Sequence, residues 1–341
     1  MHIFESLNDY TPHLTRPLIL GIGNFDGVHL AHQKLLAHVV KKAQESGGSA
    51  AVFTFRDHPQ KILNPSNLNL KLLMSLNHRL ATLKRLQMDA CFLMHFTEAF
   101  SRIEPECFVE DILLNRLKVQ TVVMGYNARF GLGRRGDAAM MKQLAKQKNF
   151  SFMAIDPVEL ANDVISSSRI RGEIAMGNLQ LANQCLGRPF SIWAPVTRGN
   201  QMGKPLGYPT ANLDIANQLM PQEGVYAVMT RVVDVSFHEI SATSSKMQSI
   251  DTGKWFQGAL NYGKRPTLPG QMMEQAVAEV FLLDYEGDLY GKTLEIVFVR
   301  KLRDEKRFKN GDLLRQQIQK DVLAARKCLK SGGEEELYKL G

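Results

Sequence analysis

The first half of the chain alternates short apolar runs with stretches of helical periodicity. The runs lie at Leu18–Ile22, Ala50–Phe55, Ala90–Met94, Thr121–Met124 and Phe150–Ile155, and the helical stretches lie around residues 29–46, 76–87, 105–116 and 137–147. This alternation is typical of a parallel sheet with helices on both faces. From residue 17 to about 156 we therefore predict a Rossmann-like α/β/α domain, whose ligands bind beyond the carboxyl ends of the strands.

The pattern changes near residue 187. A helical stretch from Leu179 to Leu186 ends at Gly187, a residue type that suits a helix C-cap. Short strand-like runs follow, separated by turns, at Ser191–Val196, Gly224–Val233, Trp255–Leu260, Ala276–Leu283 and Leu294–Val299. They predict an antiparallel β-barrel, and residues 311–329 predict an amphipathic terminal helix. Residues 234–254 are polar and are interpreted as a long loop or an insertion.

Length and composition narrow the class of protein. A chain of 341 residues favours two domains, and we place them at residues 1–186 and 187–341. Hydrophobic residues make up 44% of the chain, enough for folded cores, and the formal charge of +8 suits either nucleic acid or polyphosphate substrates. Four scattered cysteines, a polar N-terminus without a signal-peptide core and the lack of a long apolar stretch predict a cytoplasmic protein.

A first candidate site lies in Gly21-Ile22-Gly23-Asn24-Phe25-Asp26-Gly27-Val28-His29-Leu30-Ala31-His32. This turn follows an apolar strand and opens a helix, whose free N–H groups and dipole suit a phosphate. His29 and His32 share one helix face, where two imidazoles can stabilise charge on a phosphate under attack. The alternatives are an ordinary α/β turn and a zinc site, although no further ligand cluster completes the latter. No G-x-G-x-x-G fingerprint supports a dinucleotide-binding domain.

A second candidate site lies in Gly199-Asn200-Gln201-Met202-Gly203-Lys204-Pro205-Leu206-Gly207-Tyr208-Pro209-Thr210-Ala211-Asn212. Its glycine and lysine spacing is one residue short of a P-loop, and Pro205 replaces the Ser or Thr that would hold magnesium, so a P-loop is rejected. Further on, Glu279 stands in an apolar strand, where a lone carboxylate is costly unless it has a task or a partner. The alternative is a glutamate that faces water from an edge strand.

These motifs together resemble the prokaryotic bifunctional riboflavin kinase/FAD synthetase family, in the same order over roughly residues 17 to 325. The turn with His29 and His32 resembles the HxGH-type signature of nucleotidylyltransferases, with Ala31 where the family usually has Gly. Residues 54–59 are similar to T-F-x-P-H-P, with Asp57 in place of a proline. Residues 125–131 are similar to G-x-[DN]-F-x-F-G, with Ala128 in place of the usual aromatic, and residues 165–171 are similar to I-S-S-T-x-I-R.

The resemblance implies an adenylyltransferase site in the first domain. The FMN phosphate would attack the α-phosphorus of ATP with Mg²⁺ assisting and pyrophosphate leaving, which requires positioning and charge stabilisation rather than a protein nucleophile. His29 and His32 are the implied catalytic residues. The residues implied to bind ATP or its phosphates are Gly23, Asn24, Phe25, Asp26, His29, His32, Asn127, Arg134, Ser167, Ser168 and Arg171.

The second stretch resembles the riboflavin kinase signature G-x-x-x-G-R-x-L-G-[FY]-P-T-A-N, with Lys204 for its arginine. By this resemblance Thr210 and Asn212 help to hold Mg²⁺, whose preferred ligands are oxygens and phosphate. Glu279 would be the general base that takes the proton of the riboflavin 5′-hydroxyl. The implied ATP- and flavin-binding residues are Gly203, Lys204, Gly207, Pro209, Thr210, Asn212, Asn261, Arg265 and Arg303.

The expected activity is therefore bifunctional, with riboflavin phosphorylated to FMN and FMN adenylylated to FAD. Riboflavin, FMN and ATP are the expected partners, Mg²⁺ is the expected cofactor, FMN and FAD are product ligands, and no nucleic acid, membrane or obligate protein partner is expected. One open alternative is a riboflavin kinase with a weak or silent adenylyltransferase module, because Ala31, Asp57 and Ala128 depart from the family pattern. The more distant alternative is a basic nucleic-acid-binding protein.

Overall fold

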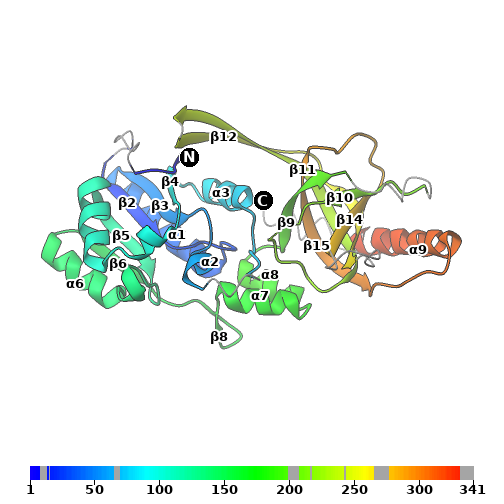
Figure 1. The fold of residues 1–341 in the computed structure, drawn as a ribbon, viewed down its shortest axis with the longest axis horizontal. Coiled ribbons are helices and arrows are strands. Elements are labelled where there is room, and N and C mark those ends of the chain that lie inside the picture. Colours follow the sequence, from blue (N-terminus) through cyan, green and yellow to red (C-terminus); the bar gives the residue numbers. More distant parts are fainter. Residues whose placement is uncertain are drawn as a thin grey trace. The chain divides into compact units, whose positions relative to one another are not determined.

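The computed structural model describes all residues except 8–13, 15, 65–69, 199–206, 216, 242, 265–275 and 331–341. The chain forms two compact units. Unit 1 comprises Met1–Lys71, Leu76–Ser167 and Val235–Ser249, and unit 2 comprises Leu72–Ser75, Ser168–Asp234 and Ile250–Gly341. The predicted classes are confirmed, since unit 1 contains a parallel sheet with helices and unit 2 an antiparallel barrel (Figure 1).

Unit 1 is built on a parallel sheet with the strand order β1-β4-β3-β2-β5-β6. The strands are β1 (His2–Phe4), β2 (Leu18–Ile22), β3 (Ser49–Phe55), β4 (Ala90–Met94), β5 (Val119–Gly125) and β6 (Ser151–Ile155). Five of them coincide with the predicted apolar runs, because strands buried on both faces need nearly continuous hydrophobic sequence. The three-residue β1 lies in the polar N-terminal stretch and was not predicted.

The four predicted helical stretches of unit 1 are confirmed. The helical elements are α1 (Leu30–Ser46), α2 (Gln60–Leu63), α3 (Leu76–Arg85), α4 (Glu98–Ser101), α5 (Pro105–Cys107), the π-helix η1 (Phe108–Arg116), the 3₁₀ turn η2 (Leu132–Arg134) and α6 (Ala138–Lys148). A small hairpin, β7 (Glu159–Leu160) and β8 (Asp163–Val164), follows. The stretch around residues 105–116 is helical as predicted, although most of it has π-helical hydrogen bonding, which side-chain spacing alone does not reveal.

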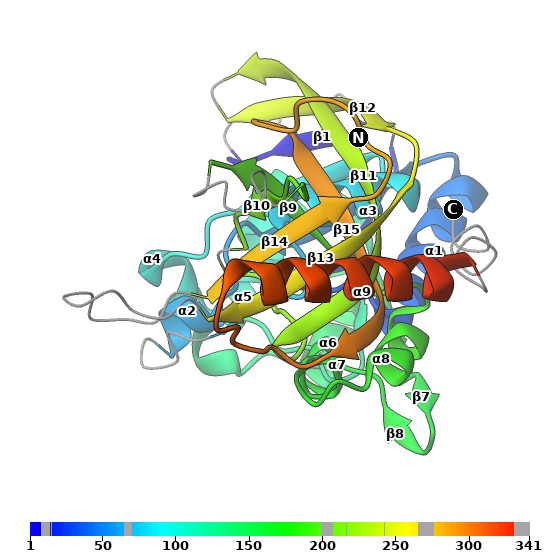
Figure 2. The same cartoon turned by 90° about the vertical axis from the view of Figure 1, so that its right-hand side faces the viewer.

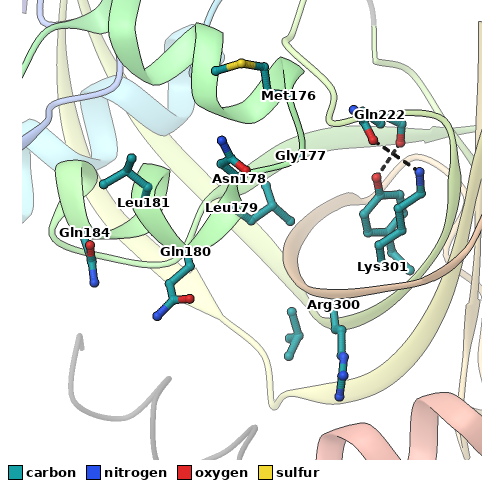
Figure 3. A pocket seen from close by; sticks show the side chains of 12 residues that line it. Met176, Gly177, Asn178, Leu179, Gln180, Leu181, Gln184, Gln222, Arg300 and Lys301 are labelled. Carbon is teal, nitrogen blue, oxygen red and sulfur yellow. Dashed lines mark hydrogen bonds between the residues drawn. The ribbon is translucent and has the colours of Figure 1, made fainter.

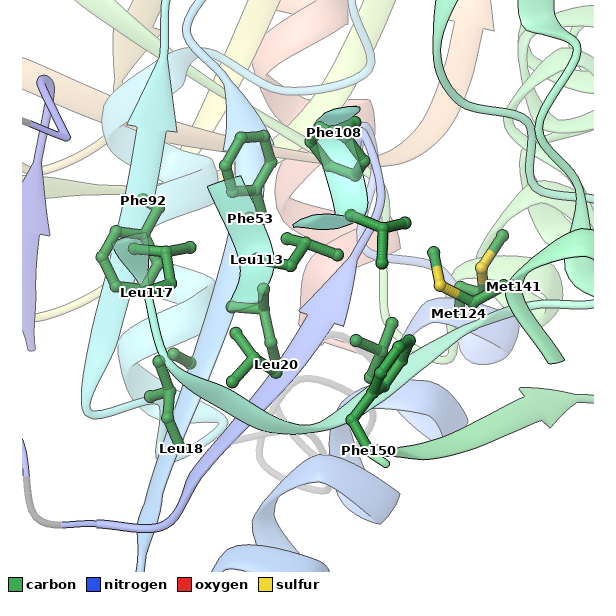
Figure 4. Packing of buried hydrophobic residues seen from close by; sticks show 14 of the residues in the cluster. Leu18, Leu20, Phe53, Phe92, Phe108, Leu113, Leu117, Met124, Met141 and Phe150 are labelled. Carbon is green, nitrogen blue, oxygen red and sulfur yellow. The ribbon is translucent and has the colours of Figure 1, made fainter. Parts of the chain in front are cut away.

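A hydrophobic core fixes the sheet of unit 1. Figure 4 shows Phe53 of β3 and Phe92 of β4 in this core, together with Phe108 and Leu113 of η1. Each of these four side chains is at most 4% exposed. Since interiors of this kind are close-packed, the core holds the carboxyl ends of the strands in a defined arrangement. The first candidate site lies at one of those ends.

Residues 234–254, predicted to be a long loop or an insertion, do not form a loop, and whether they are an insertion stays a prediction. The strands β11 (Gly224–Ser241) and β12 (Ser244–Thr252) run through this segment, and β12 pairs antiparallel with β1. Residues 235–249 belong to unit 1, where Met247 is only 1% exposed and the Lys84 ammonium donates to the Met247 carbonyl at 3.1 Å. The sequence of β12 is mostly polar and therefore gives no apolar repeat from which a strand could be predicted. The strand is stabilised by backbone pairing with β1.

Unit 2 contains a closed barrel. Its strands are β9 (Ser191–Thr197), β10 (Ala211–Leu213), the first part of β11, β13 (Phe256–Lys264), β14 (Ala276–Leu282) and β15 (Thr293–Arg303). In the described residues each strand pairs antiparallel with two others, in the ring β9-β10-β14-β13-β11-β15. The helices are α7 (Ser167–Ala175), α8 (Leu179–Leu186) and α9 (Gly311–Lys330). Gly187 ends α8 with φ +69°, which confirms the predicted cap.

The terminal helix α9 lies against β13 and β15 (Figure 2). Ala325 and Leu329 are buried in a cluster with Ala227, Met229 and Val297. Asp321 accepts two hydrogen bonds from the Arg303 guanidinium, at 2.9 and 2.7 Å, which ties the helix to the end of β15. None of the helices in the described ranges combines the length and hydropathy that crossing a bilayer would require.

Candidate functional site

The turn between β2 and α1 carries the first site on a strained backbone. Phe25, Gly27 and Val28 have φ values of +51°, +82° and +38°. Positive φ is costly for a β-branched residue, so Val28 is an outlier that only the surrounding packing maintains. Phe25 and Val28 are fully buried, and a Cβ on Gly23 would lie 3.1 Å from the Phe25 ring. Backbone strain that is held in this way is common at functional sites, so it supports the predicted role of this turn, which stays a prediction.

His29 and His32 lie together at the start of α1, as their spacing predicts. Their rings stack with centroids 3.7 Å apart and an interplanar angle of 17°. His29 is also the N-cap, because its Nδ1 accepts from the His32 backbone N–H at 3.4 Å. This bond assigns the proton of a neutral His29 ring to Nε2. Phe25 contacts the edge of this pair, with its ring centroid 5.2 Å from that of His32.

Two side chains donate hydrogen bonds to the backbone carbonyl of Asn24. The hydroxyl of Thr54 donates to it at 3.2 Å, and the guanidinium of Arg79 donates to it at 2.9 Å. Arg79 also donates to the carbonyls of Phe55, at 2.5 Å, and Arg56, at 3.3 Å. Burial lowers the pKa of Arg79 from its ordinary value, and the nearby Asp26 carboxylate acts in the opposite direction. One buried cation thereby joins the turn after β2 to the turn after β3.

The serine-containing segment at residues 165–171 also contacts the turn between β2 and α1. The Ser167 hydroxyl donates to the carbonyl of Asp26 at 2.9 Å, and Asp26 is 3% exposed. Ser167 is the first residue of α7, and Arg171 follows one helical turn later, while Ser168 is exposed. The boundary between the units falls directly after Ser167, so Ser168 and Arg171 belong to unit 2.

The loop after β5 is held at its base and exposed at its tip. Phe130 and Gly136 exchange backbone hydrogen bonds at 3.0 and 2.9 Å, which closes the loop. Asn127 and Arg134 are both exposed, and Arg134 has φ +59°. In the described residues no hydrogen bond or ion pair joins Asn127 or Arg134 to the turn after β2, so their predicted role stays a prediction.

An aromatic surface at the strand ends of unit 1 was not recognised from the sequence. Phe55 ends β3, and its ring lies 5.0 Å from that of Phe96 and 5.3 Å from that of Phe100. All three rings are partly exposed, unlike Phe53 and Phe108 beneath them. The spacing of these residues carries no periodic signal because they come from a strand end, a loop and a short helix.

The second site is a row of polar side chains across the barrel. Asn212 of β10 and Asn261 of β13 both pair directly with Glu279 of β14. Residues that face each other in antiparallel pairs point to the same side, with Cβ atoms about 4.5–5.5 Å apart. Ala278 and Val280 are fully buried, so Glu279 lies on the opposite face, where it is half-buried. The edge-strand alternative for Glu279 is wrong, because β14 lies between β10 and β13.

The segment before β10 is positioned along the same face. Gly207 has φ +83°, a conformation that favours glycine, and the Tyr208 ring packs edge-on against Phe281, 5.4 Å away. Phe281 lies two residues after Glu279 and therefore on its face of the strand. Pro209 is exposed and Thr210 half-buried, and Thr210 lies two residues before Asn212. Gly203, Lys204 and Arg265 fall outside the described residues.

The donors of Arg303 are engaged within unit 2. Two go to Asp321, and a third goes to the carbonyl of Asp304 at 2.8 Å. The Phe308 ring centroid lies 5.9 Å from the guanidinium carbon. In this structure Arg303 therefore joins β15 to α9, and its predicted contact with a ligand stays a prediction.

Two family models match this chain, one in each half, and several known proteins are similar to most of its length. A family model described as FAD synthetase matches residues 11–169, and one described as riboflavin kinase matches residues 186–329. A protein of Haemophilus influenzae named bifunctional riboflavin kinase/FMN adenylyltransferase is 36% identical over 309 residues, which cover 90% of this chain and 92% of that protein. A protein of the same name from Pseudomonas fluorescens is 33% identical, over 96% of this chain and 97% of that protein.

Among solved structures, one titled as a macrolide-efflux protein from Streptococcus pneumoniae is similar to this chain along nearly its whole length. The alignment covers 95% of this chain and 98% of that one, with a TM-score of 0.77 and 27% sequence identity.

Proposed function

Because the chain belongs to the bifunctional riboflavin kinase/FMN adenylyltransferase family, we propose that the two sites described above perform the two reactions of that name. The chain carries both domains, so it is a riboflavin kinase and an FMN adenylyltransferase. The turn of His29 and His32 is the proposed adenylyltransferase site. The row of Asn212, Glu279 and Asn261 is the proposed kinase site, and its strand register is the observation on which the assignment rests most heavily.

In the adenylyl transfer, an oxygen of the FMN phosphate forms a bond to the α-phosphorus of ATP, and the bond from that phosphorus to the β-phosphate oxygen breaks. His29 and His32 stabilise the charge on the phosphoryl oxygens, together with the N–H groups at the start of α1. Asn127, Arg134, Ser167, Ser168 and Arg171 complete the proposed nucleotide contacts. Gly23, Asn24, Phe25 and Asp26 supply the backbone that approaches the phosphates.

The flavin ring of FMN is proposed to lie on the aromatic surface formed by Phe55, Phe96 and Phe100. The support is geometric, since these partly exposed rings lie at the carboxyl ends of the strands, the edge at which such sheets bind ligands. A planar heterocycle gains about 0.5–1.5 kcal/mol from stacking or edge contact beyond the area it buries.

In the kinase reaction, the riboflavin 5′-hydroxyl loses its proton to Glu279 as its oxygen bonds to the γ-phosphorus of ATP, and ADP leaves. A carboxylate on a half-buried face beside two amides can both accept the proton and orient the hydroxyl. Asn261 lies beside Glu279 and is proposed to orient the reacting groups. Gly203, Lys204, Gly207, Pro209, Arg265 and Arg303 are proposed as the remaining ATP or flavin contacts.

The residues of the kinase site fit Mg²⁺. Thr210 and Asn212 offer oxygen donors on one side of Glu279, and Mg²⁺ prefers oxygen ligands and keeps several waters and substrate phosphates. Thr210 and Asn212 would hold the ion, which would neutralise charge on the ATP phosphates. The protein groups do the rest, in positioning the hydroxyl and removing its proton.

Riboflavin, FMN and ATP fit the two domains as substrates, and the positive charge of the chain suits such polyphosphates. We further propose that the protein acts in the cytoplasm, without nucleic acid, a membrane or an obligate protein partner. We propose residue 187 as the start of the kinase part of the chain, a choice supported by the end of α8 at Gly187. Residues 168–186 nevertheless pack with unit 2.

The experiment that tests the proposed function incubates the purified protein with riboflavin, ATP and Mg²⁺ and separates the flavins over time. FMN should appear first and FAD afterwards, with ADP and pyrophosphate released in step with them. FMN that accumulates without FAD would instead identify a kinase with a silent adenylyltransferase, and no FMN at all would contradict the assignment of the kinase reaction.

A further inference from the structure

A cavity in unit 2 lies apart from the residues assigned to catalysis. It has a volume of about 620 Å³, and its walls come from the α7–α8 connection, the start of β11 and the end of β15 (Figure 3). Neither Thr210, Asn212, Asn261 nor Glu279 is among the residues that line it. Its volume falls in the range of about 300–1,000 Å³ that is typical of small-molecule sites.

The lining is cationic. Arg300 and Lys301 contribute side chains from β15, and the described lining includes no aspartate or glutamate. Lys301 donates to Asp304, outside the lining, at 2.7 Å, while Arg300 is exposed to solvent. The two side chains point apart (Figure 3), as those of successive strand residues do, so Arg300 is the cation of the described lining placed to meet an anion. Its planar guanidinium is suited to the paired oxygens of a phosphate.

The other polar groups of the lining are amides. Gln180 and Gln184 project from α8, Asn178 precedes that helix, and Gln222 lies across from them. In Figure 3, Gln180 and Arg300 extend in the same direction from two different walls. Primary amides both donate and accept, which is the pairing that the edge of a heterocyclic base or a flavin requires. Leu179 and Val299 add apolar surface between these groups.

One wall of the cavity is held rigidly around Gln222. The Tyr226 hydroxyl donates to the Gln222 carbonyl at 2.5 Å, and burial raises the pKa of Tyr226 to about 12, so this hydroxyl remains a donor at neutral pH. The Lys301 ammonium lies 3.5 Å from the amide oxygen of Gln222. Gly177, with φ +85°, approaches the same amide so closely that a Cβ there would lie 3.3 Å from its oxygen. The cavity is therefore preformed on this side.

We propose that this cavity is a second nucleotide-binding site, in which Arg300 binds the phosphate and the amides of α8 and Gln222 contact the heterocycle. The chemistry fits a flavin nucleotide and an adenine nucleotide alike. The proposal does not depend on the assignment of either catalytic site, because no residue assigned to catalysis lines the cavity.

Hydrogen–deuterium exchange of the full chain tests the proposal, with FMN, ADP or inorganic pyrophosphate added as separate probes. We expect at least one probe to slow exchange in peptides that cover residues 176–184. If only pyrophosphate protects these peptides from exchange, the cavity is a phosphate site. If only FMN or only ADP protects them, that probe identifies the heterocycle that the cavity binds. Absence of protection by all three probes at millimolar concentration overturns the proposal.

The Arg300→Gln variant distinguishes binding in this cavity from changes in exchange that are caused by ligand binding at the catalytic sites. The variant should weaken the apparent affinity measured at residues 176–184 about tenfold or more, the loss expected for one charge-assisted contact to phosphate. Protection of residues 207–212 by ADP should persist in the variant. Arg300→Lys should lose less, and Arg315→Gln, which removes an exposed arginine of α9 outside the lining, should behave as the wild type. Equal protection in wild type and Arg300→Gln would overturn the assignment.

Discussion

A buried arginine, Arg79, holds the backbone of the first site in place. Arg79 is 8% exposed and donates to the carbonyls of Asn24, Phe55 and Arg56. In the sequence it reads as one of several charges on an amphipathic helix. The role of Arg79 can be recognised only in the folded structure, where it joins the ends of β2 and β3. Its partners are backbone carbonyls, which leave no pattern in a sequence.

We predict that Arg79→Gln lowers kcat for FAD formation about a hundredfold, since displacing reacting groups by about 1 Å can cost that much. Arg79→Lys should recover part of the loss, because an ammonium can still donate to one of the carbonyls. Steady-state assays of FAD formation from FMN and ATP measure both.

Riboflavin phosphorylation by the same variants is the internal control and should be unchanged. Arg85→Gln, at the exposed end of the same helix, should leave both activities intact. Unchanged FAD formation in Arg79→Gln would refute the role of this arginine.

The residue pattern alone did predict part of the sites. The stacking partners His29 and His32 follow from helical spacing, which is local. The neighbourhood of Glu279 does not, because the register of β10, β14 and β13 is set by pairing between segments far apart in the sequence. Only the family resemblance linked Asn212, Asn261 and Glu279 before the fold was known.

At the scale of elements, long apolar runs were predictable and short or polar strands were not. β2 and β4 match their predicted bounds, whereas β1, β10 and β12 were missed. β10 has three residues and β12 is polar, and both are stabilised chiefly by the strands beside them.

The attachment of α9 to the barrel depends on a largely buried ion pair. The Arg303 and Asp321 side chains are 16% and 9% exposed, and their contact is bidentate. We predict that Asp321→Asn destabilises unit 2 by about 2–4 kcal/mol, because it leaves a poorly solvated guanidinium without its charge partner. Urea unfolding followed by tryptophan fluorescence reports on this unit, since the two tryptophans, Trp193 and Trp255, both belong to it.

The matched control is Glu286→Gln, an exposed carboxylate in the turn after β14. It should shift stability by less than about 0.5 kcal/mol, as is usual for surface substitutions. An equally small effect of Asp321→Asn would contradict the stabilising role of the Arg303–Asp321 ion pair.

At the scale of the whole molecule, the residues proposed for catalysis belong to different units, His29 and His32 to unit 1 and Glu279 to unit 2, although the chain passes between the units more than once. Residues 235–249 leave the barrel to add a strand beside β1, and α7 begins in unit 1 and continues in unit 2. The single boundary expected from the sequence follows from the change in periodicity near residue 187. Periodicity could not reveal the returning segment, since a polar strand has no apolar repeat to detect.

Each site nevertheless has its own residues, so each reaction should be removable without the other. Glu279→Gln should lower FMN formation from riboflavin about a hundredfold or more, in the range for loss of a general base, and leave FAD formation from supplied FMN unchanged. His29→Asn should do the reverse, and asparagine preserves the cap of α1 while removing the imidazole.

The most direct test of two independent sites is the amount of FAD that an equimolar mixture of Glu279→Gln and His29→Asn makes from riboflavin, ATP and Mg²⁺. We predict almost no FAD from either variant alone and substantial FAD from the mixture, because FMN released by His29→Asn is adenylylated by Glu279→Gln. A mixture as inactive as its components, or a single variant that makes FAD from riboflavin at the wild-type rate, would contradict the account.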